Sequence, residues 1–245
     1  MIKFSLVTLF LVSASTSFAF SASDNASNYT GGWTNLSNAG TGFNPWGFTT
    51  DVDDTAEIVS STVGAGDINT GINSFRIASN NGSSLDVFRS FGGGASLSAG
   101  DIFSFDLSVN YRNGNKGFDL RNAGAGLFNF NVGSNNYFFG GIDLGAEGWA
   151  YVDDGVYSLE FGFVTETMMN AKITRTSGSD STRSFEIANV ALSGAIDNFK
   201  FYVSGTDDDS ANNSLYFNNL TVIPESSVYG LILGALALAT VARRR

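Results

Sequence analysis

Hydrophobic and polar residues alternate along much of the chain between residues 70 and 222. The clearest alternation runs from Ile102 to Asn110, where Phe, Leu and Val occupy every second position and Ser and Asp lie between them. This period of two is typical of a β-strand with one face on a core and the other in water. It recurs plainly at 128–132, 157–163 and 199–203, and more weakly at 75–77, 85–91, 118–120, 137–142, 171–176, 185–190 and 215–222.

Short segments rich in Gly, Asn, Ser and Asp separate these strands, and no helical period of 3.6 residues lies between them. One of them, Asn113-Gly114, predicts a type I′ hairpin, because both residue types tolerate a positive φ. About a dozen antiparallel strands with regular turns predict an all-β fold, a jelly-roll-like antiparallel β-sandwich. The polar stretch 21–44 is either a loose arm or a first edge strand around Trp33. The pattern of strands and turns between the two terminal segments resembles that of the concanavalin A-like lectin and glucanase sandwiches.

The N-terminal segment Met1–Ala19 has the three parts of a secretory signal peptide. Lys3 supplies the positive charge, Leu6–Val12 is a short apolar core, and small residues at positions 17 and 19 form a cleavage site after Ala19, with Ala22 as the alternative position. The apolar part is too short to cross a bilayer, so we expect this signal to be removed. A buried core helix is the alternative interpretation.

The C-terminal segment reads Pro224-Glu225-Ser226, then an apolar run over Val228–Ala242, then a basic cluster. That cluster is formed by Arg243, Arg244 and Arg245. Such a run stopped by arginines tethers a chain to a membrane, with the arginines held in the cytoplasm. It is shorter than the roughly 20 residues of a spanning helix. It is therefore either a permanent anchor or a temporary one.

Pro-Glu motif, apolar helix and arginine cluster together resemble the PEP-CTERM sorting signal of Gram-negative bacteria. The family pattern commonly has a second proline where this chain has Ser226. The resemblance implies a transient hold in the inner membrane and cleavage near Pro224-Glu225 by an exosortase-like processing enzyme. It also implies transfer to the cell surface or extracellular matrix, in bacteria that usually make an exopolysaccharide. The domain organisation expected is then signal peptide 1–19, β-sandwich 20–223 and sorting signal 224–245.

Composition excludes several classes of function. The net charge is −10, so we expect no nucleic acid partner, because phosphate binding needs clustered Lys and Arg. The absence of Cys and His removes the usual ligands of zinc, haem and iron–sulfur clusters, and with them the Ser–His–Asp triad. No cofactor is expected apart from calcium, which is bound by oxygen ligands.

Acidic turns are the candidate calcium ligands. Asp207, Asp208 and Asp209 are consecutive, and similar clusters occur at 51–54 and 153–154, although none has the spacing of an EF-hand. Solvated turn acids are the alternative. Catalytic carboxylates are not indicated: Glu160 lies on an alternating strand with Glu166 at the same parity, but without the motif of the sandwich glucanases.

Trp149 and Tyr151 are the candidate carbohydrate platform. They lie two residues apart, so on a strand they share one face, and aromatic rings stack on the apolar faces of sugars. The alternative is that they fill the core, as most large aromatics do in a sandwich.

Three functions follow from these patterns. The first is an exported surface or matrix protein without catalytic activity. The second is a lectin-like carbohydrate-binding module, with or without calcium. The third is an enzyme acting on polysaccharide.

Overall fold

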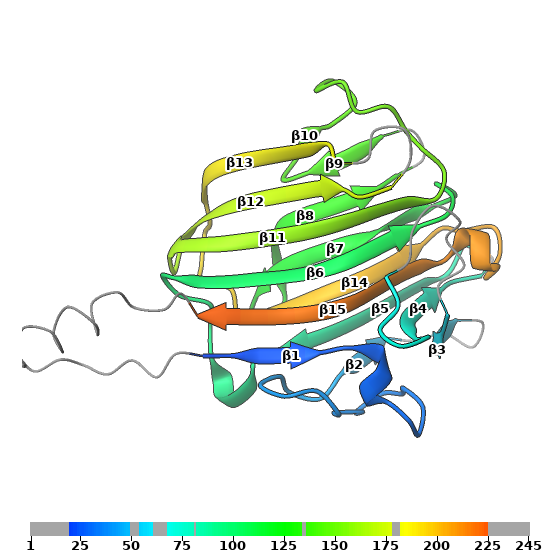
Figure 1. The fold of residues 1–245 in the computed structure, drawn as a ribbon, viewed down its shortest axis with the longest axis horizontal. Helices are drawn as coiled ribbons and strands as arrows, with labels where there is room; N and C mark the ends of the chain where they lie inside the picture. The colour runs from blue at the N-terminus through cyan, green and yellow to red at the C-terminus, as the bar shows by residue number, and fades with distance from the viewer. Residues whose placement is uncertain are drawn as a thin grey trace, which may run out of the picture.

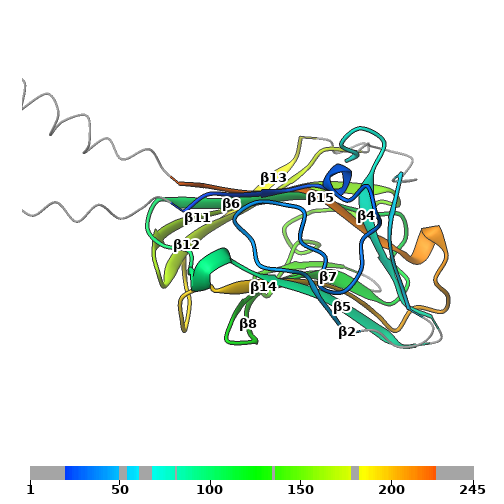
Figure 2. The same ribbon diagram turned by 90° about the horizontal axis from the view of Figure 1, so that it is seen from below.

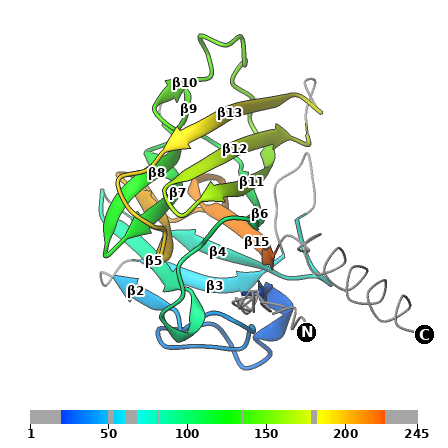
Figure 3. The same cartoon turned by 90° about the vertical axis from the view of Figure 1, so that its left-hand side faces the viewer.

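The structure, a computed structural model, describes residues 20–49, 54–60, 68–80, 82–133, 136–177 and 182–224. Two antiparallel sheets pack face to face in this part of the chain, and Figure 2 shows them edge-on as two layers. Figure 1 looks onto the larger sheet, and Figure 3 views the same two layers from one end. The prediction of an antiparallel β-sandwich is confirmed.

The larger sheet has eight described strands in the order β13-β12-β11-β6-β15-β4-β3, with β1 also paired to β15. Their bounds are β1 Ala22–Asp24, β3 Thr55–Val59, β4 Ser74–Ala78, β6 Asp101–Val109, β11 Gly155–Thr165, β12 Met168–Arg175, β13 Ser184–Ala191 and β15 Leu215–Pro224.

The smaller sheet has seven described strands in the order β10-β9-β8-β7-β14-β5-β2. Their bounds are β2 Gly47–Thr49, β5 Ser84–Ser90, β7 Asn115–Asn122, β8 Ala125–Val132, β9 Tyr137–Phe139, β10 Ile142–Asp143 and β14 Asn198–Ser204. Three short 3-10 helices lie in the connections: η1 Ala26–Asn28, η2 Gly92–Gly94 and η3 Ala211–Asn213.

Phenylalanine fills the space between the sheets. Phe105 and Phe118 come from opposite sheets and their ring centroids are 4.4 Å apart; Phe201 and Phe217 stack at 3.8 Å. Each of these four rings is almost wholly buried. Because burying such a side chain stabilises the fold by about 1.5–3 kcal/mol, this aromatic layer holds the sandwich together without disulfides.

Strand β15 joins the N-terminal segment to the larger sheet. One of its edges pairs with β4 over Leu215–Phe217 and with β1 over Leu220–Val222. Its pairing with β6 on the other edge shifts in register between Asn218 and Thr221. Asn218 lies at the shift, fully buried. It accepts from the amide of Ala26 at 2.9 Å and donates to the carbonyls of Ile68 and Asn73, both at 2.9 Å.

A buried ion pair fastens the same N-terminal segment to the smaller sheet. Arg89 on β5 and Asp24 on β1 are paired, and both side chains are completely buried. Asp24 also accepts from the Tyr29 hydroxyl at 2.6 Å, and Arg89 donates to Asn38 and to the carbonyl of Asn44. Stretch 21–44 is thus neither a loose arm nor a strand around Trp33: its strand is β1, and Trp33 is a core residue.

The strands expected from alternation are present, except that the one expected over 137–142 is split by a turn at Gly140-Gly141 into β9 and β10, and β1, β2 and β3 were missed. β1 and β2 have three residues each, too few to show a period. The type I′ prediction was wrong. Gly114 has a φ of +69°, but Asn113 is not among the residues with positive φ, and its side chain is held by Asp207.

The expected signal peptide and most of the expected sorting signal lie outside the described residues. β15 continues through Pro224, which pairs with Asp101, so the proline of the Pro-Glu motif belongs to the sandwich. Among the described residues, no helix has the length and apolar character needed to cross a membrane.

Candidate functional site

The outer face of the smaller sheet carries a set of polar and aromatic side chains that strand register brings together. On β14, Phe199, Phe201 and Val203 point into the core, so the residues between them point outward. Pairing aligns those residues with outward residues of β5, β7 and β8. We call the resulting group the Tyr202 face: Asp86, Phe88, Gly117, Asp119, Arg121, Asn129, Asn131, Asn198, Lys200 and Tyr202.

The ring of Tyr202 lies across the neighbouring strand β7, over Gly117. A Cβ added at Gly117 would come within 2.7 Å of the Tyr202 hydroxyl and 2.0 Å of the Phe130 carbonyl, so only glycine leaves room. The Tyr202 Oη accepts from the side-chain amides of Asn129 and Asn131, each at 2.8 Å. Its own proton has no acceptor within the described residues, and it is free to donate to a ligand.

Burial raises the pKa of Tyr202, although the hydrogen bonds from Asn129 and Asn131 act in the opposite direction. The hydroxyl is therefore protonated at neutral pH and acts as a hydrogen-bond donor rather than as a base.

Lys200 lies at the centre of the Tyr202 face. Its Nζ is 3.0 Å from Asp86 on β5 and 3.5 Å from Asp119 on β7, and it lies 5.1 Å from the centroid of the Tyr202 ring. Asp119 also accepts from Asn129 at 2.7 Å. These groups fix one another, and they present carboxylate, amide and ammonium groups side by side around a half-buried ring.

Phe88, near the edge of the sheet, is a second aromatic residue whose ring lies over a glycine. A Cβ added at Gly47 on β2 would meet the Phe88 ring at 2.3 Å, so this ring also lies over a glycine of the next strand. Beside it is a hollow of about 690 Å³, which we call the Arg121 hollow. It is lined by Asn35, Leu36, Pro45, Trp46, Gly47, Phe48, Phe88, Arg89, Ser90, Arg121, Ala123, Gly124 and Asn198.

The two rings lie on a surface that is partly open to solvent. In the order β7-β14-β5-β2, Tyr202 leans onto the first strand and Phe88 onto the last. At about 4.8 Å between neighbouring strands, the rings lie on the order of 10–15 Å apart across the sheet. A long ligand with repeated flat faces can contact both rings, with Lys200 and its carboxylates between them.

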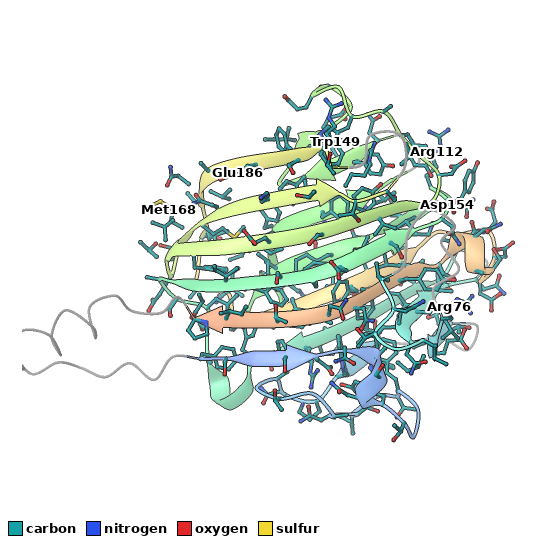
Figure 4. All side chains as sticks on the ribbon, in the orientation of Figure 1. Arg76, Arg112, Trp149, Asp154, Met168 and Glu186 are labelled. Atoms are coloured by element: carbon teal, nitrogen blue, oxygen red, sulfur yellow. The ribbon has the colours of Figure 1, made fainter. Side chains whose placement is uncertain are left out.

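Trp149 and Tyr151 do not form the predicted platform. They lie in the connection between β10 and β11, not on a strand, and Trp149 is buried against Arg175, whose Cζ is 4.8 Å from its ring. Tyr151 stacks on Tyr137 at 5.6 Å and carries Arg112 on its ring at 4.4 Å. Figure 4 shows Trp149 and Arg112 on this side of the molecule. The prediction that Trp149 and Tyr151 share one strand face was wrong, because the segment that contains them does not belong to a sheet.

The acidic turn 207–209 makes protein contacts in place of a metal site. Asp207 accepts from Asn113 at 2.9 Å, and the Asp209 carbonyl accepts from Arg76. Asp208 accepts from the Ser210 amide at 3.0 Å and from Asn213 at 2.6 Å, and the bonds from Ser210 and Asn213 lower its pKa. Asp208 does share a hollow of about 420 Å³ with Asp153 and Asp154, and Asp154 is labelled in Figure 4.

Across the described residues, no three acidic side chains come close enough together to hold a metal ion. Calcium at residues 207–209 therefore finds no support in the geometry. The side chains of Asp207 and Asp208 accept hydrogen bonds from Asn113, Ser210 and Asn213 instead, so they are tied to other protein groups rather than only solvated.

Glu160 and Glu166 are not a catalytic pair. Glu160 is exposed on the outer face of the larger sheet, opposite Lys172 and Ser104, and Glu166 follows the end of β11 in a turn. The carboxylates that do come together, Asp86 and Asp119, lie 33 positions apart by their numbers. Alternation placed Lys200 and Tyr202 on one face, but no sequence pattern indicated which strands lie beside β14.

Of the residues expected to direct processing, only Pro224 lies within the described part of the chain, at the end of β15. Ala19, Glu225 and Arg243–Arg245 lie outside it. Pro224 and Ala22 lie near each other, because β1 pairs antiparallel with the last residues of β15.

No protein-family model matches the chain, and no curated protein does. Among solved structures, the chain is similar to an endo-β-1,4-glucuronan lyase from the fungus Trichoderma reesei, with 12% identity, a TM-score of 0.42, and coverage of 71% of this chain and 89% of that one. It is similar to peanut lectin with a nine-residue peptide, with 10% identity, a TM-score of 0.42, and coverage of 84% and 99%.

It is also similar to the receptor binding domain of botulinum neurotoxin D, with 13% identity, a TM-score of 0.42, and coverage of 82% of this chain and 50% of that one. At these identities and scores the likeness is general, and nothing about ligand or activity follows from it.

Proposed function

We propose that the protein is an exported carbohydrate-binding module and that the Tyr202 face is its binding surface. The observation that carries this proposal is the pair of aromatic rings, Tyr202 and Phe88, each lying over a glycine of the next strand. A ring held in this way offers one face to the apolar side of a sugar. The amides and carboxylates around Tyr202 supply hydrogen-bond partners for sugar hydroxyls.

Binding to polysaccharides tests this proposal. We expect purified protein to bind at least one member of a panel of neutral and acidic polysaccharides, measured by affinity electrophoresis and calorimetry. Tyr202→Ala removes a ring and a donor, so it should weaken binding by about tenfold or more. Glu160→Ala, on the outer face of the other sheet, is the matched control and should leave binding unchanged. A panel with no binding would refute the proposal.

Hydrolysis of a polysaccharide is a second candidate, because Asp86 and Asp119 both lie within ion-pair distance of one Lys200. Glycoside hydrolases need two carboxyl groups, one of which donates a proton. Here the ammonium of Lys200 lies between the two, and both carboxylates serve as its partners. Release of reducing ends from a bound polysaccharide, abolished by Asp119→Asn, would favour hydrolysis over binding alone.

We also propose that the chain is exported, held transiently in the inner membrane and processed near Pro224-Glu225. Strand pairing supports this proposal, since Ala22 at the start of β1 pairs with Val222 near the end of β15, so the first and last described strands meet at one end of the sandwich. The mass of the mature protein measures this directly. We expect a chain that lacks residues 1–19 and the segment after about Pro224. A mature chain that still ends in Arg245 would refute the processing step, with no bearing on carbohydrate binding.

A further inference from the structure

The Arg121 hollow differs in charge from the rest of the protein. The chain carries a net charge of −10, yet the residues that line this hollow include two arginines and no carboxylate. Two other hollows on the described surface are lined by acids: Asp119 in one, and Asp153, Asp154 and Asp208 in the other. The Arg121 hollow is therefore the place among these three where an anionic group meets positive charge without repulsion.

Arg121 carries that charge. The other arginine of the hollow, Arg89, is neutralised by its buried pair with Asp24. Arg121 donates from Nη2 to the carbonyl of Gly124, and its Nε–H has no acceptor in the described part of the chain. Within the described residues, no carboxylate lies at ion-pair distance from its guanidinium.

The acids nearest to Arg121 along the chain and across the sheet are engaged elsewhere. Asp119 pairs with Lys200 at 3.5 Å, and Asp197 accepts from the amide of Ala123 at 3.1 Å and from Asn198. A planar guanidinium without an acid partner matches a carboxylate, with which it forms two parallel hydrogen bonds.

Aromatic and polar groups beside Arg121 suit a sugar ring. Asn198 lies directly opposite Arg121 on β14, and Phe88 lies opposite Lys200 on the next strand. The hollow thus combines a half-exposed ring for stacking, a side-chain amide for hydroxyls and a guanidinium. At about 690 Å³ it has room for a sugar residue.

We propose that the Arg121 hollow binds a uronic acid residue of the polysaccharide, with its carboxylate on Arg121 and its ring on Phe88. This inference rests on the proposed carbohydrate binding and adds its chemical class: the ligand is an acidic polysaccharide. Binding is then strongest for polymers with a carboxylate on the sugar ring, and it weakens as salt concentration rises.

Matched polymers test the inference. Polygalacturonate, alginate, hyaluronan and glucuronan are each compared with the same polymer after its carboxyl groups have been reduced to alcohols. We expect at least one native polymer to bind about tenfold or more tightly than its reduced form. Dextran sulfate is a further ligand that separates carboxylate recognition from general attraction to polyanions.

Two substitutions locate the effect. Arg121→Gln should remove the preference for the native polymer, so that this variant binds the native and the reduced polymer with equal affinity. Lys172→Gln, which removes the same charge from the outer face of the other sheet, should change neither. Thermal unfolding of both variants checks that the fold is retained.

The outcomes separate the two proposals. If native and reduced polymers bind equally, if Arg121→Gln weakens both alike, or if dextran sulfate alone is bound, the uronic acid site is overturned while carbohydrate or polyanion binding remains. If no polymer, neutral or acidic, is bound, carbohydrate binding itself fails.

Discussion

Lys116 is a cation buried inside the sandwich, where it points into the core side of β7 with no side-chain surface exposed. Its Nζ donates to the carbonyls of Tyr111, at 2.9 Å, and of Asn113. These two carbonyls accept hydrogen bonds from the ammonium but supply no opposite charge. Burial therefore lowers the pKa of Lys116 to about 7 from its usual 10.5.

This lowered pKa predicts that the protein becomes more stable as the pH rises from about 7 to 10. In that range the unfolded chain holds a proton on Lys116 that the folded chain has released, so raising the pH favours the folded state. Each unit of pKa difference contributes about 1.4 kcal/mol. Because the chain has no His and no Cys, few other groups titrate there. Above pH 10 the trend reverses, since burial raises the pKa of Tyr29 to about 12 and that of other core tyrosines.

Urea unfolding at several pH values measures this effect. Lys116→Met should flatten the rise in the free energy of unfolding between pH 7 and 9.5, whereas the exposed Lys172→Met should keep it. An unchanged slope in Lys116→Met would show that Lys116 titrates normally in the folded protein.

At the scale of elements, glycines decide how the strands of the smaller sheet present their side chains. Gly117 and Gly47 each lie under an aromatic ring, but their surroundings differ. A Cβ at Gly117 would meet the backbone carbonyl of Phe130 at 2.0 Å, which cannot give way, whereas at Gly47 the nearest atoms are the outer carbons of the half-buried Phe88 side chain.

The two glycines therefore predict different outcomes for the same substitution. Gly117→Ala should lower the free energy of unfolding by roughly 1–3 kcal/mol, because β7 and β8 must separate locally. Gly47→Ala should change stability by less than about 1 kcal/mol but tilt the Phe88 ring and weaken polysaccharide binding. Denaturant unfolding and affinity electrophoresis on both variants distinguish these effects. Equal loss of stability in the two variants would contradict the prediction.

The environment of each strand explains whether the alternation of hydrophobic and polar residues predicts it. Strands such as β6 and β14 have a core on one side and water on the other, so Phe105 or Phe201 alternates with a polar neighbour. The short β1 and β2 have no such record in sequence, because tertiary contacts hold them in place. For β1 those contacts are the pairing of Ala22–Asp24 with β15 and the ion pair of Asp24 with Arg89, and for β2 the pairing of Gly47–Thr49 with β5.

At the scale of the whole molecule, the N-terminal segment connects the two sheets. β1 pairs with β15 of the larger sheet, and Asp24 at its end pairs with Arg89 of the smaller one. Removing one partner of a buried ion pair costs about 3–5 kcal/mol, because it leaves a charge without its counterpart.

A pair of truncations follows from this role. A chain that begins at Phe20 should unfold at the same temperature as one carrying residues 1–19, since it keeps β1 and Asp24. A chain that begins at Asn25 loses both, and it should be less stable by about 3–5 kcal/mol. Calorimetry compares the two. A small difference in stability between the two chains would mean that the sheets hold together without β1 and Asp24.

Part of the candidate site could be predicted from the sequence, and part of it depends on the fold. The outward direction of Lys200 and Tyr202 follows from alternation on one strand. That Asp86, Asp119 and Arg121 lie beside them does not, because the partners of β14 are β5 and β7, far apart in sequence and joined by register alone. Trp149 and Tyr151 looked better placed in sequence, yet the loop that carries them folds Trp149 into the core.

By itself the sequence determined the all-β class, the long strands and the direction of their side chains, because a core on one side of a strand imposes a period of two on the residues. It also carries the terminal patterns on which the proposed export and processing rest, and these lie mostly outside the described residues. The tertiary structure alone decided which strands are neighbours, that two rings lie over glycines of adjacent strands, and that Arg121 has no acid partner. Those features depend on contacts between residues far apart in the chain, and no local pattern of side chains records them.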